Sequence, residues 1–145
     1  MDFIASLHKR AAGLHKTIVL PESMVDDRTL KAAARIRDEG FAGVVVLGEE
    51  AAVAAKFKEL GLDAAGVRVI DPMRSSYRAD FVREYHELRR HKGMTEEEAA
   101  RTLEDPLFFG AMLVRRGLAD GMVAGAVNST GNVLRAGFQI VGMAP

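Results

Sequence analysis

Apolar residues follow two alternating patterns along this chain. Short continuous apolar runs predict buried strands, because a strand covered on both faces has no polar face to present. These runs lie at 16–22 (KTIVLPE), 42–50 (AGVVVLGEE), 67–72 (VRVIDP) and 120–127 (DGMVAGAV). Between them, apolar residues recur at the three- and four-residue spacing that is typical of helices. The chain therefore reads as strands separated by helices.

The segments between the runs also carry helix start and stop signals. Gly40 and Gly61 stand where helices should end, and Pro106 stands where one should begin. Thr95 and Glu98 have the spacing of a capping box. Helices are predicted at 28–40, 50–61, about 76–91, 96–105, 106–117 and 132–141, after an amphipathic N-terminal helix with Phe3, Ile4, Leu7, Ala11 and Leu14 on one face.

The alternation of strands and helices predicts a parallel sheet with right-handed crossovers. We therefore expect an α/β fold, a three-layer α-β-α domain with a mostly parallel sheet. The chain has 145 residues, which is the size of one ordinary domain. No internal repeat or linker divides it, so we expect residues 1–145 to form a single α/β domain.

Composition narrows the classes of function. The 20 basic and 20 acidic residues cancel, so no overall field indicates nucleic acid or an anionic membrane. The absence of cysteine excludes disulfides, thiolate zinc sites and a cysteine nucleophile. No apolar run approaches the roughly 20 residues that cross a bilayer, and the N-terminus does not have the pattern of a signal peptide. We therefore expect a cytoplasmic protein with no nucleic-acid or membrane partner.

The junction after the fourth predicted strand has the residue types of an anion site. In a parallel sheet, ligands bind beyond the carboxyl ends of the strands. Asn128, Ser129, Thr130 and Gly131 stand there, offering hydroxyl donors and close approach to the backbone. Arg135 follows in the first turns of the predicted helix, where a cation opposes the helix dipole unless an anion lies nearby. A capped turn with a solvent-facing arginine explains the same residues, and residue types alone leave both interpretations open.

Helical periodicity singles out a second arginine. At about 100° per residue, the helix predicted at about 76–91 carries an apolar stripe made of Tyr77, Phe81, Tyr85 and Leu88. Arg89 lies on the flank of that stripe, so we expect it at the edge of a packed interface or cleft. Arg90 lies nearly opposite the stripe, so we expect it to be an ordinary surface charge.

Several familiar motifs are missing. The P-loop spacing and the glycine fingerprint of dinucleotide-binding folds do not occur at any predicted strand–helix junction, and no nucleophile elbow is present. The histidines (His8, His15, His86, His91) lack the spacing of metal ligands. We therefore expect no metal site and no permanently bound cofactor.

Three stretches together are similar to a known family. "TIVLPE", "ELRRHKGMT" and "DPLFFGAMLVRRGLADGMVAGAVNSTGNVLR" occur in an order that resembles the N-terminal half of phosphate acetyltransferases (phosphotransacetylases). The similarity covers essentially the whole chain. One departure is Ala136, which stands where many members have proline. The resemblance implies the first domain of a two-domain acyltransferase, with the second domain and the C-terminal helices absent.

The resemblance also implies an activity. The family transfers an acetyl group reversibly between coenzyme A and phosphate, without a metal and usually as a homodimer. By resemblance, Arg89 would bind coenzyme A, and Arg135 with Ser129 and Thr130 would lie near acetyl phosphate or its leaving phosphate. Asn128 and Gly131 complete the expected substrate-binding set. The family's base lies in the missing half, so we expect no catalytic residue in this chain and no activity from it alone.

Other readings of the resemblance stay open at this point. A phosphate butyryltransferase would share these residues, because the acyl pocket is not visible in them. A non-catalytic acyl-CoA-sensing domain similar to phosphotransacetylases is a further alternative, and so is an α/β interaction domain without enzymatic function.

Overall fold

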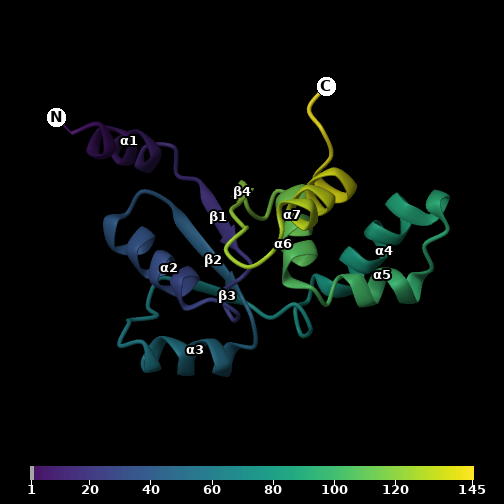
Figure 1. Cartoon of the computed structure of the whole chain (residues 1–145), viewed down its shortest axis with the longest axis horizontal. Helices are drawn as coiled ribbons and strands as arrows, with labels where there is room; N and C mark the ends of the chain where they lie inside the picture. Colours follow the sequence, from purple (N-terminus) through teal and green to yellow (C-terminus); the bar gives the residue numbers. More distant parts are fainter. Residues whose placement is uncertain (1) are drawn as a thin grey trace.

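The computed structural model describes residues 2–145 and places the described strands in one parallel sheet (Figure 1). The strands are β1 (Thr17–Leu20), β2 (Gly43–Leu47), β3 (Arg68–Ile70) and β4 (Gly121–Met122). Their order across the sheet is β3-β2-β1-β4, so β1 and β2 are central. β1 pairs with β2 in parallel from Thr17 and Gly43 to Leu20 and Val46. The predicted α/β fold with a parallel sheet is confirmed.

One helix precedes the first strand, and the others connect successive strands or follow the last one. They are α1 (Phe3–Ala12), α2 (Asp27–Glu39), α3 (Glu50–Glu59), α4 (Arg78–Arg89), η1 (Arg90–Lys92), α5 (Glu96–Thr102), α6 (Pro106–Arg115), α7 (Thr130–Ala136) and η2 (Gly137–Val141). The element η1 is a 3₁₀ turn, and η2 is a π-helical turn that directly follows α7. The predicted capping box is present at the start of α5, where Thr95 and Glu98 bond each other's backbone.

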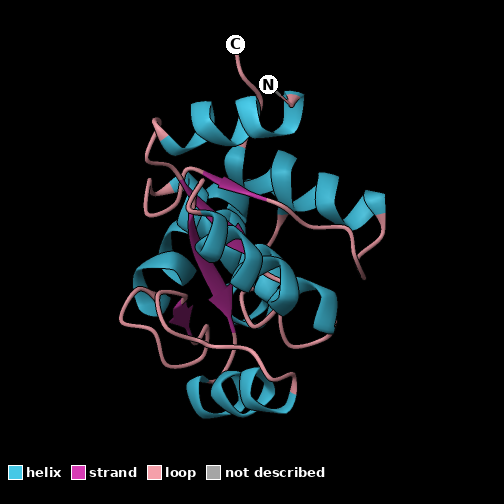
Figure 2. Cartoon of the chain, turned by 90° about the vertical axis from the view of Figure 1, so that its left-hand side faces the viewer, coloured by secondary structure: helices cyan, strands magenta, loops and turns pink. Residues whose placement is uncertain are grey.

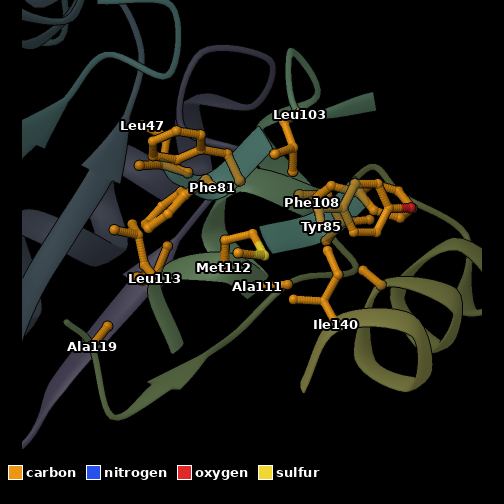
Figure 3. Close-up of a cluster of buried hydrophobic side chains, with 14 of the residues drawn as sticks. Leu47, Phe81, Tyr85, Leu103, Phe108, Ala111, Met112, Leu113, Ala119 and Ile140 are labelled. Atoms are coloured by element: carbon orange, nitrogen blue, oxygen red, sulfur yellow. The ribbon is translucent and has the colours of Figure 1, made fainter. Parts of the chain in front are cut away.

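Alternate residues of the central strands contribute to two separate cores. Val44 and Val46 pack with α2 and α3, whereas Val45 and Leu47 pack with α4, α5, α6 and the C-terminal helices. Helices consequently lie on both sides of the sheet, as Figure 2 shows. Figure 3 shows the second core, which includes Phe81 of α4 and Leu113 of α6. The three-layer arrangement predicted from the alternation is therefore confirmed, while α1 buries none of its residues.

Two predicted boundaries are wrong. The strand predicted at 120–127 is only β4, although the N–H of Val123 still donates to the carbonyl of Val19 at 3.0 Å. Beyond that bond the chain leaves the sheet, and the backbone N–H groups of residues 125–128 bond a side chain instead of a strand. The helix predicted at 132–141 begins two residues earlier, at Thr130, because the hydroxyl of Ser129 caps it by accepting the N–H of Asn132 at 3.2 Å.

Helix α6 approaches the sheet closely through Gly110. A methyl group at this position would lie 2.9 Å from the sulfur of Met122 and 3.1 Å from a side-chain carbon of Val19. Both neighbours are strand residues, so the absence of a side chain at Gly110 sets the distance between α6 and the sheet. Since β4 leads directly into the candidate site, this contact also helps to place that site.

We predict that Gly110→Ala lowers the free energy of unfolding by about 1–3 kcal/mol, because overpacking outweighs the gain in helix propensity. Gly137→Ala is the control, since nothing lies within 4 Å of a methyl group there and its φ of −59° suits alanine. Urea unfolding monitored by circular dichroism measures both. Equal stabilities of the two variants would contradict the prediction.

Candidate functional site

The predicted anion-binding residues follow β4 as expected. Residues 123–129 form the loop between β4 and α7, which we call the 123–129 loop. Ser129, Thr130 and Gly131 are all exposed, and Asn128 is half-buried. Since β4 pairs with β1, the loop lies beside the chain that leaves the carboxyl end of β1. That neighbouring segment supplies a residue that the sequence argument did not select.

Glu22 holds the 123–129 loop. One oxygen of its carboxylate, Oε1, accepts the backbone N–H groups of Gly125 at 2.8 Å and Ala126 at 2.9 Å. The other, Oε2, accepts the backbone N–H groups of Val127 at 2.8 Å and Asn128 at 2.6 Å. The side-chain amide of Asn128 donates to Oε2 as well, at 3.1 Å. Four consecutive backbone donors therefore converge on one side chain.

These bonds keep a buried carboxylate ionised. Glu22 is only 4% exposed, and burial by itself raises the pKa of a carboxyl group. The N–H groups of residues 125–128 act in the opposite direction because they bond the charged form. The result is a pKa for Glu22 of about 2, below the ordinary 4.5. The loop and the carboxylate thus stabilise each other.

Two further features shape the same loop. Gly125 has a φ of +119°, a backbone conformation that side chains of L-residues rarely adopt. The guanidinium of Arg28 donates to the carbonyl of Ala126 at 3.3 Å and also bonds Asp26. The loop is therefore bonded on its N–H side by Glu22 and on its carbonyl side by Arg28. The conformational need for glycine in this loop therefore falls at Gly125, a position that the sequence argument did not single out.

The other predicted site residues differ in whether their hydrogen-bonding groups already have partners within the protein. The hydroxyl of Ser129 accepts the N–H of Asn132 as the cap of α7, and the amide nitrogen of Asn128 bonds Glu22. Gly131 borders open space, because a methyl group there would meet only the hydroxyl of Ser129, at 3.9 Å. Thr130 and Gly131 are thus open to a ligand approaching from solvent.

Arg135 is placed differently in its helix than predicted. Because α7 begins at Thr130, Arg135 lies in the last turn of this seven-residue helix, not in its first turns. The helical backbone continues directly from α7 through η2 to Val141, so Arg135 lies between the two ends of this helical segment, where the helix dipole neither supports nor opposes a bound anion. The side chain is exposed. The case for Arg135 as an anion-binding residue therefore depends on the residues around it.

The arginine at the end of α4 lies in a more enclosed position. Arg89 is half-buried, and its Nε is enclosed without a hydrogen-bond partner among residues 2–145. Arg90, by contrast, is exposed and pairs with Glu87 at 3.3 Å. The predicted difference between the two adjacent arginines is confirmed. A buried donor without a partner is unusual in a folded protein, so this unused N–H marks Arg89 as a candidate binding residue.

A buried tyrosine connects Arg89 and Arg135 electrostatically. Tyr85 belongs to the core cluster of Figure 3, with Phe108 and Ile140, and its hydroxyl donates to Oε1 of Gln139 at 2.9 Å. Burial raises the pKa of Tyr85, and the positive charges of Arg89 and Arg135 partly oppose that rise. Both arginines thus lie within electrostatic reach of one hydroxyl group.

Ion pairs and one hydrogen bond tie the helix that carries Arg89 to α6 and to the segment that follows Arg135. Glu84 of α4 accepts from Arg115 at 2.7 Å and from Arg116 at 2.9 Å, so α4 is tied to the end of α6. Arg115 also donates to the carbonyl of Ile140 in η2 at 3.0 Å. Burial raises the pKa of Glu84, but its bonds to both arginines lower this pKa by more than burial raises it. The net pKa therefore lies below its usual range. One arginine therefore bridges α4 and the helical segment that follows Arg135.

The most voluminous hollows are elsewhere on the surface. One of about 580 Å³ opens at the carboxyl ends of β2 and β3 and is lined by Glu49, Asp71 and Arg74 among others, but by none of the six predicted residues. A smaller hollow, of about 190 Å³, borders the 123–129 loop between Glu22, Pro106 and Asn128.

Within residues 2–145, acidic and histidine side chains do not form a group that could hold a metal ion. No helix among these residues is long and apolar enough to cross a membrane.

Comparisons with known proteins agree with this architecture. The family described as "Phosphate acetyl/butaryl transferase" matches residues 2–145. A phosphate acetyltransferase of Acetivibrio thermocellus is 46% identical over 145 residues, which cover 100% of this chain and 43% of that protein. One from Bacillus subtilis is 38% identical over 140 residues, covering 97% of this chain and 43% of the relative.

Solved structures give the same result. The EutD phosphotransacetylase from Staphylococcus aureus matches with a TM-score of 0.86 at 36% identity, covering 98% of this chain and 43% of that one. A phosphotransacetylase from Streptococcus pyogenes matches with a TM-score of 0.87 at 34% identity, covering 97% and 43% respectively. This chain therefore spans less than half the length of these relatives.

The depressed pKa of Glu22 predicts acid-sensitive stability. The carboxylate stabilises the fold fully above its unfolded pKa near 4.5, and this contribution is lost as the pH falls toward its folded pKa of about 2. The full loss is on the order of 3 kcal/mol, of which about 2 kcal/mol falls between pH 6 and pH 3. Urea unfolding between pH 6 and pH 3 measures it, with Glu22→Gln as the comparison. The variant should be less stable at pH 6 and lose less on acidification, so parallel pH profiles would refute this assignment.

Proposed function

The chain belongs to the phosphate acetyl/butaryl transferase family, and from this membership we propose that it serves reversible acetyl transfer between coenzyme A and inorganic phosphate. The family match over residues 2–145 is the observation that carries this proposal. Acetyl is favoured over butyryl as the acyl group, because the relatives described above are phosphate acetyltransferases.

The candidate site suits the substrates of this reaction. Coenzyme A, phosphate and acetyl phosphate all present phosphate oxygens, which a planar guanidinium binds through two parallel hydrogen bonds. Arg89, with its enclosed and unused Nε, binds a phosphate of coenzyme A. Arg135, Ser129 and Thr130 bind acetyl phosphate or the phosphate that leaves it. The positive charges of both arginines affect the pKa of Tyr85, which supports assigning them to neighbouring groups of the substrates.

Asn128 and Gly131 complete this binding set without contributing charge. Asn128 keeps its side-chain oxygen for a substrate, since its nitrogen bonds Glu22. Gly131 leaves room for a phosphate to approach α7, because no other side chain occupies the space in front of it. These two residues contribute shape and hydrogen bonding, whereas the arginines contribute charge.

The proposal divides the complete reaction between two domains. Residues 1–145 form the first α/β domain, and a second domain, absent here, supplies the base that activates the thiol of coenzyme A. The relatives' greater length supports this division. No residue of this chain is then catalytic, and the chain alone is inactive. Coenzyme A is a substrate, and no cofactor or metal is held permanently.

The setting of the proposed enzyme follows from the same family membership. We propose a cytoplasmic homodimer that acts on small molecules, with no nucleic-acid or membrane partner. The near-neutral charge of the sequence supports this choice of partners, since no broad basic surface field is available to attract a polyanion. Analytical ultracentrifugation of the complete gene product tests the dimer.

The proposed function is tested by two assays of CoA-dependent phosphate release from acetyl phosphate. The first uses the 145-residue chain and the second uses the complete gene product that contains it. We expect turnover only in the second. Binding of acetyl-CoA without turnover in the complete product would favour an acyl-CoA-sensing domain instead. Faster turnover with butyryl phosphate than with acetyl phosphate would overturn the choice of acyl group.

Two adjacent arginines provide a matched test of the site. In the complete gene product, Arg89→Lys should raise the KM for coenzyme A about tenfold or more, because lysine cannot offer two parallel donors to a phosphate. Arg90→Lys should leave the KM values unchanged, because Arg90 is exposed and pairs only with Glu87 among the described residues. Equal effects of the two substitutions would argue against the role of Arg89. Arg135→Lys should raise the KM for acetyl phosphate instead.

A further inference from the structure

Both carboxylate oxygens of Glu22 accept hydrogen bonds from the protein itself. Its two oxygens accept the N–H groups of four successive residues, 125–128, at distances of 2.6 to 2.9 Å. These donors point at Glu22, so they are not available to a phosphate. The 123–129 loop is thus a backbone nest whose anion is part of the chain. An anionic substrate must be bound by the residues that follow this nest.

We propose that Glu22 is a positioning residue that sets the place of the acyl-phosphate-binding residues Ser129, Thr130 and Arg135. This inference rests on the proposed function, because it presumes that these residues meet acetyl phosphate. Glu22 itself touches no substrate, since it is 4% exposed and lies behind the loop. It acts by joining the end of β1 to the start of α7.

The covalent chain explains why the position is transmitted. Asn128, the last residue bonded to Glu22, precedes Ser129, and the hydroxyl of Ser129 caps α7 by bonding Asn132. Thr130 begins that helix, and Arg135 lies in its last turn. A shift of the nest therefore moves the cap, the helix and the arginine together. Displacements of about 1 Å at a substrate-positioning group can reduce catalytic efficiency about a hundredfold.

The atoms of the bond pattern select the informative substitution. Glu22→Gln keeps the size of the side chain but offers only one acceptor oxygen, so its NH₂ group must face either the donors of Gly125 and Ala126 or those of Val127 and Asn128. Two donors are then opposed by a donor, and the charge is lost. The nest should open on that side while the core beneath it remains packed.

A matched control separates positioning from stability. Glu49 also accepts two backbone N–H groups with its carboxylate, from Ala51 at 3.2 Å and Ala52 at 2.9 Å, as the cap of α3. Glu49→Gln therefore removes a similar bond pattern away from the 123–129 loop. Gly125→Ala is a second probe: it leaves Glu22 intact but strains the loop, since alanine does not favour a φ of +119°.

The experiment measures steady-state kinetics of the complete gene product with acetyl phosphate and coenzyme A. Glu22→Gln should raise the KM for acetyl phosphate about tenfold or more and leave the KM for coenzyme A within about threefold. Gly125→Ala should show the same split, and Glu49→Gln should change neither KM. A purely structural role of Glu22 would lower the active fraction and leave both KM values unchanged.

Three other outcomes of these kinetic measurements also test the positioning role of Glu22. If the wild type is active and Glu22→Gln has an unchanged KM for acetyl phosphate, the positioning role is overturned. The proposed function then still stands. If Glu22→Gln does not fold, Gly125→Ala decides: a selective rise in the KM for acetyl phosphate supports the role, and no rise refutes it. A wild-type product without turnover overturns the proposed function, and the positioning role falls with it.

Discussion

The loop that leads into α7 depends on one buried carboxylate from the segment that follows a different strand. Backbone N–H groups that lose water must find an acceptor, and each unsatisfied group costs about 1–3 kcal/mol. Residues 125–128 leave the sheet and cannot use a neighbouring strand, so Glu22 accepts all four of their N–H groups. The burial of Glu22 and the irregular loop are each unfavourable alone. Together they form a single stable unit.

This unit requires a particular order of strands. Glu22 follows β1 by two residues, and the loop follows β4, so the bonds form only because β1 and β4 are paired. Gly110 of α6 permits a close approach to the same two strands, since a larger residue would contact Met122 and Val19. The topology of the sheet and the geometry of the candidate site are therefore consequences of the same contacts.

Much of this architecture could be predicted from local sequence signals. The continuous apolar run of β2 and the capping box of α5 depend on nearby residues, and both are confirmed. The contrast between Arg89 and Arg90 was also predictable, because helical periodicity separates a flank from an outer face. Local periodicity thus identified a half-buried cation without reference to any ligand.

The two failures have different physical causes, one long-range and one local. The apolar run at 120–127 has the composition of a strand, yet Glu22, more than 100 residues earlier, draws its second half out of the sheet. The early start of α7 depends on Ser129 acting as a cap, and this moved Arg135 to the last turn. Glu22 ends the run predicted at 16–22, but no local pattern marks it as a residue of the site. Its only sequence signal is that an acidic residue follows Pro21 at the end of the first predicted strand. The fourth predicted strand ends at the same edge of the sheet in a loop that contains glycine.

The exposure of the candidate site bears on how the proposed reaction could proceed. Charged groups stabilise a reacting phosphate strongly only where water is excluded, because water screens them and solvates the competing ground state. Ser129, Thr130 and Arg135 are all exposed in residues 2–145, and only Arg89 is partly enclosed. These residues can select and orient an anion, but they do not supply a dry environment for its chemistry. A covering surface from outside the described residues is therefore a physical requirement of the proposed transfer, independent of which residue acts as its base.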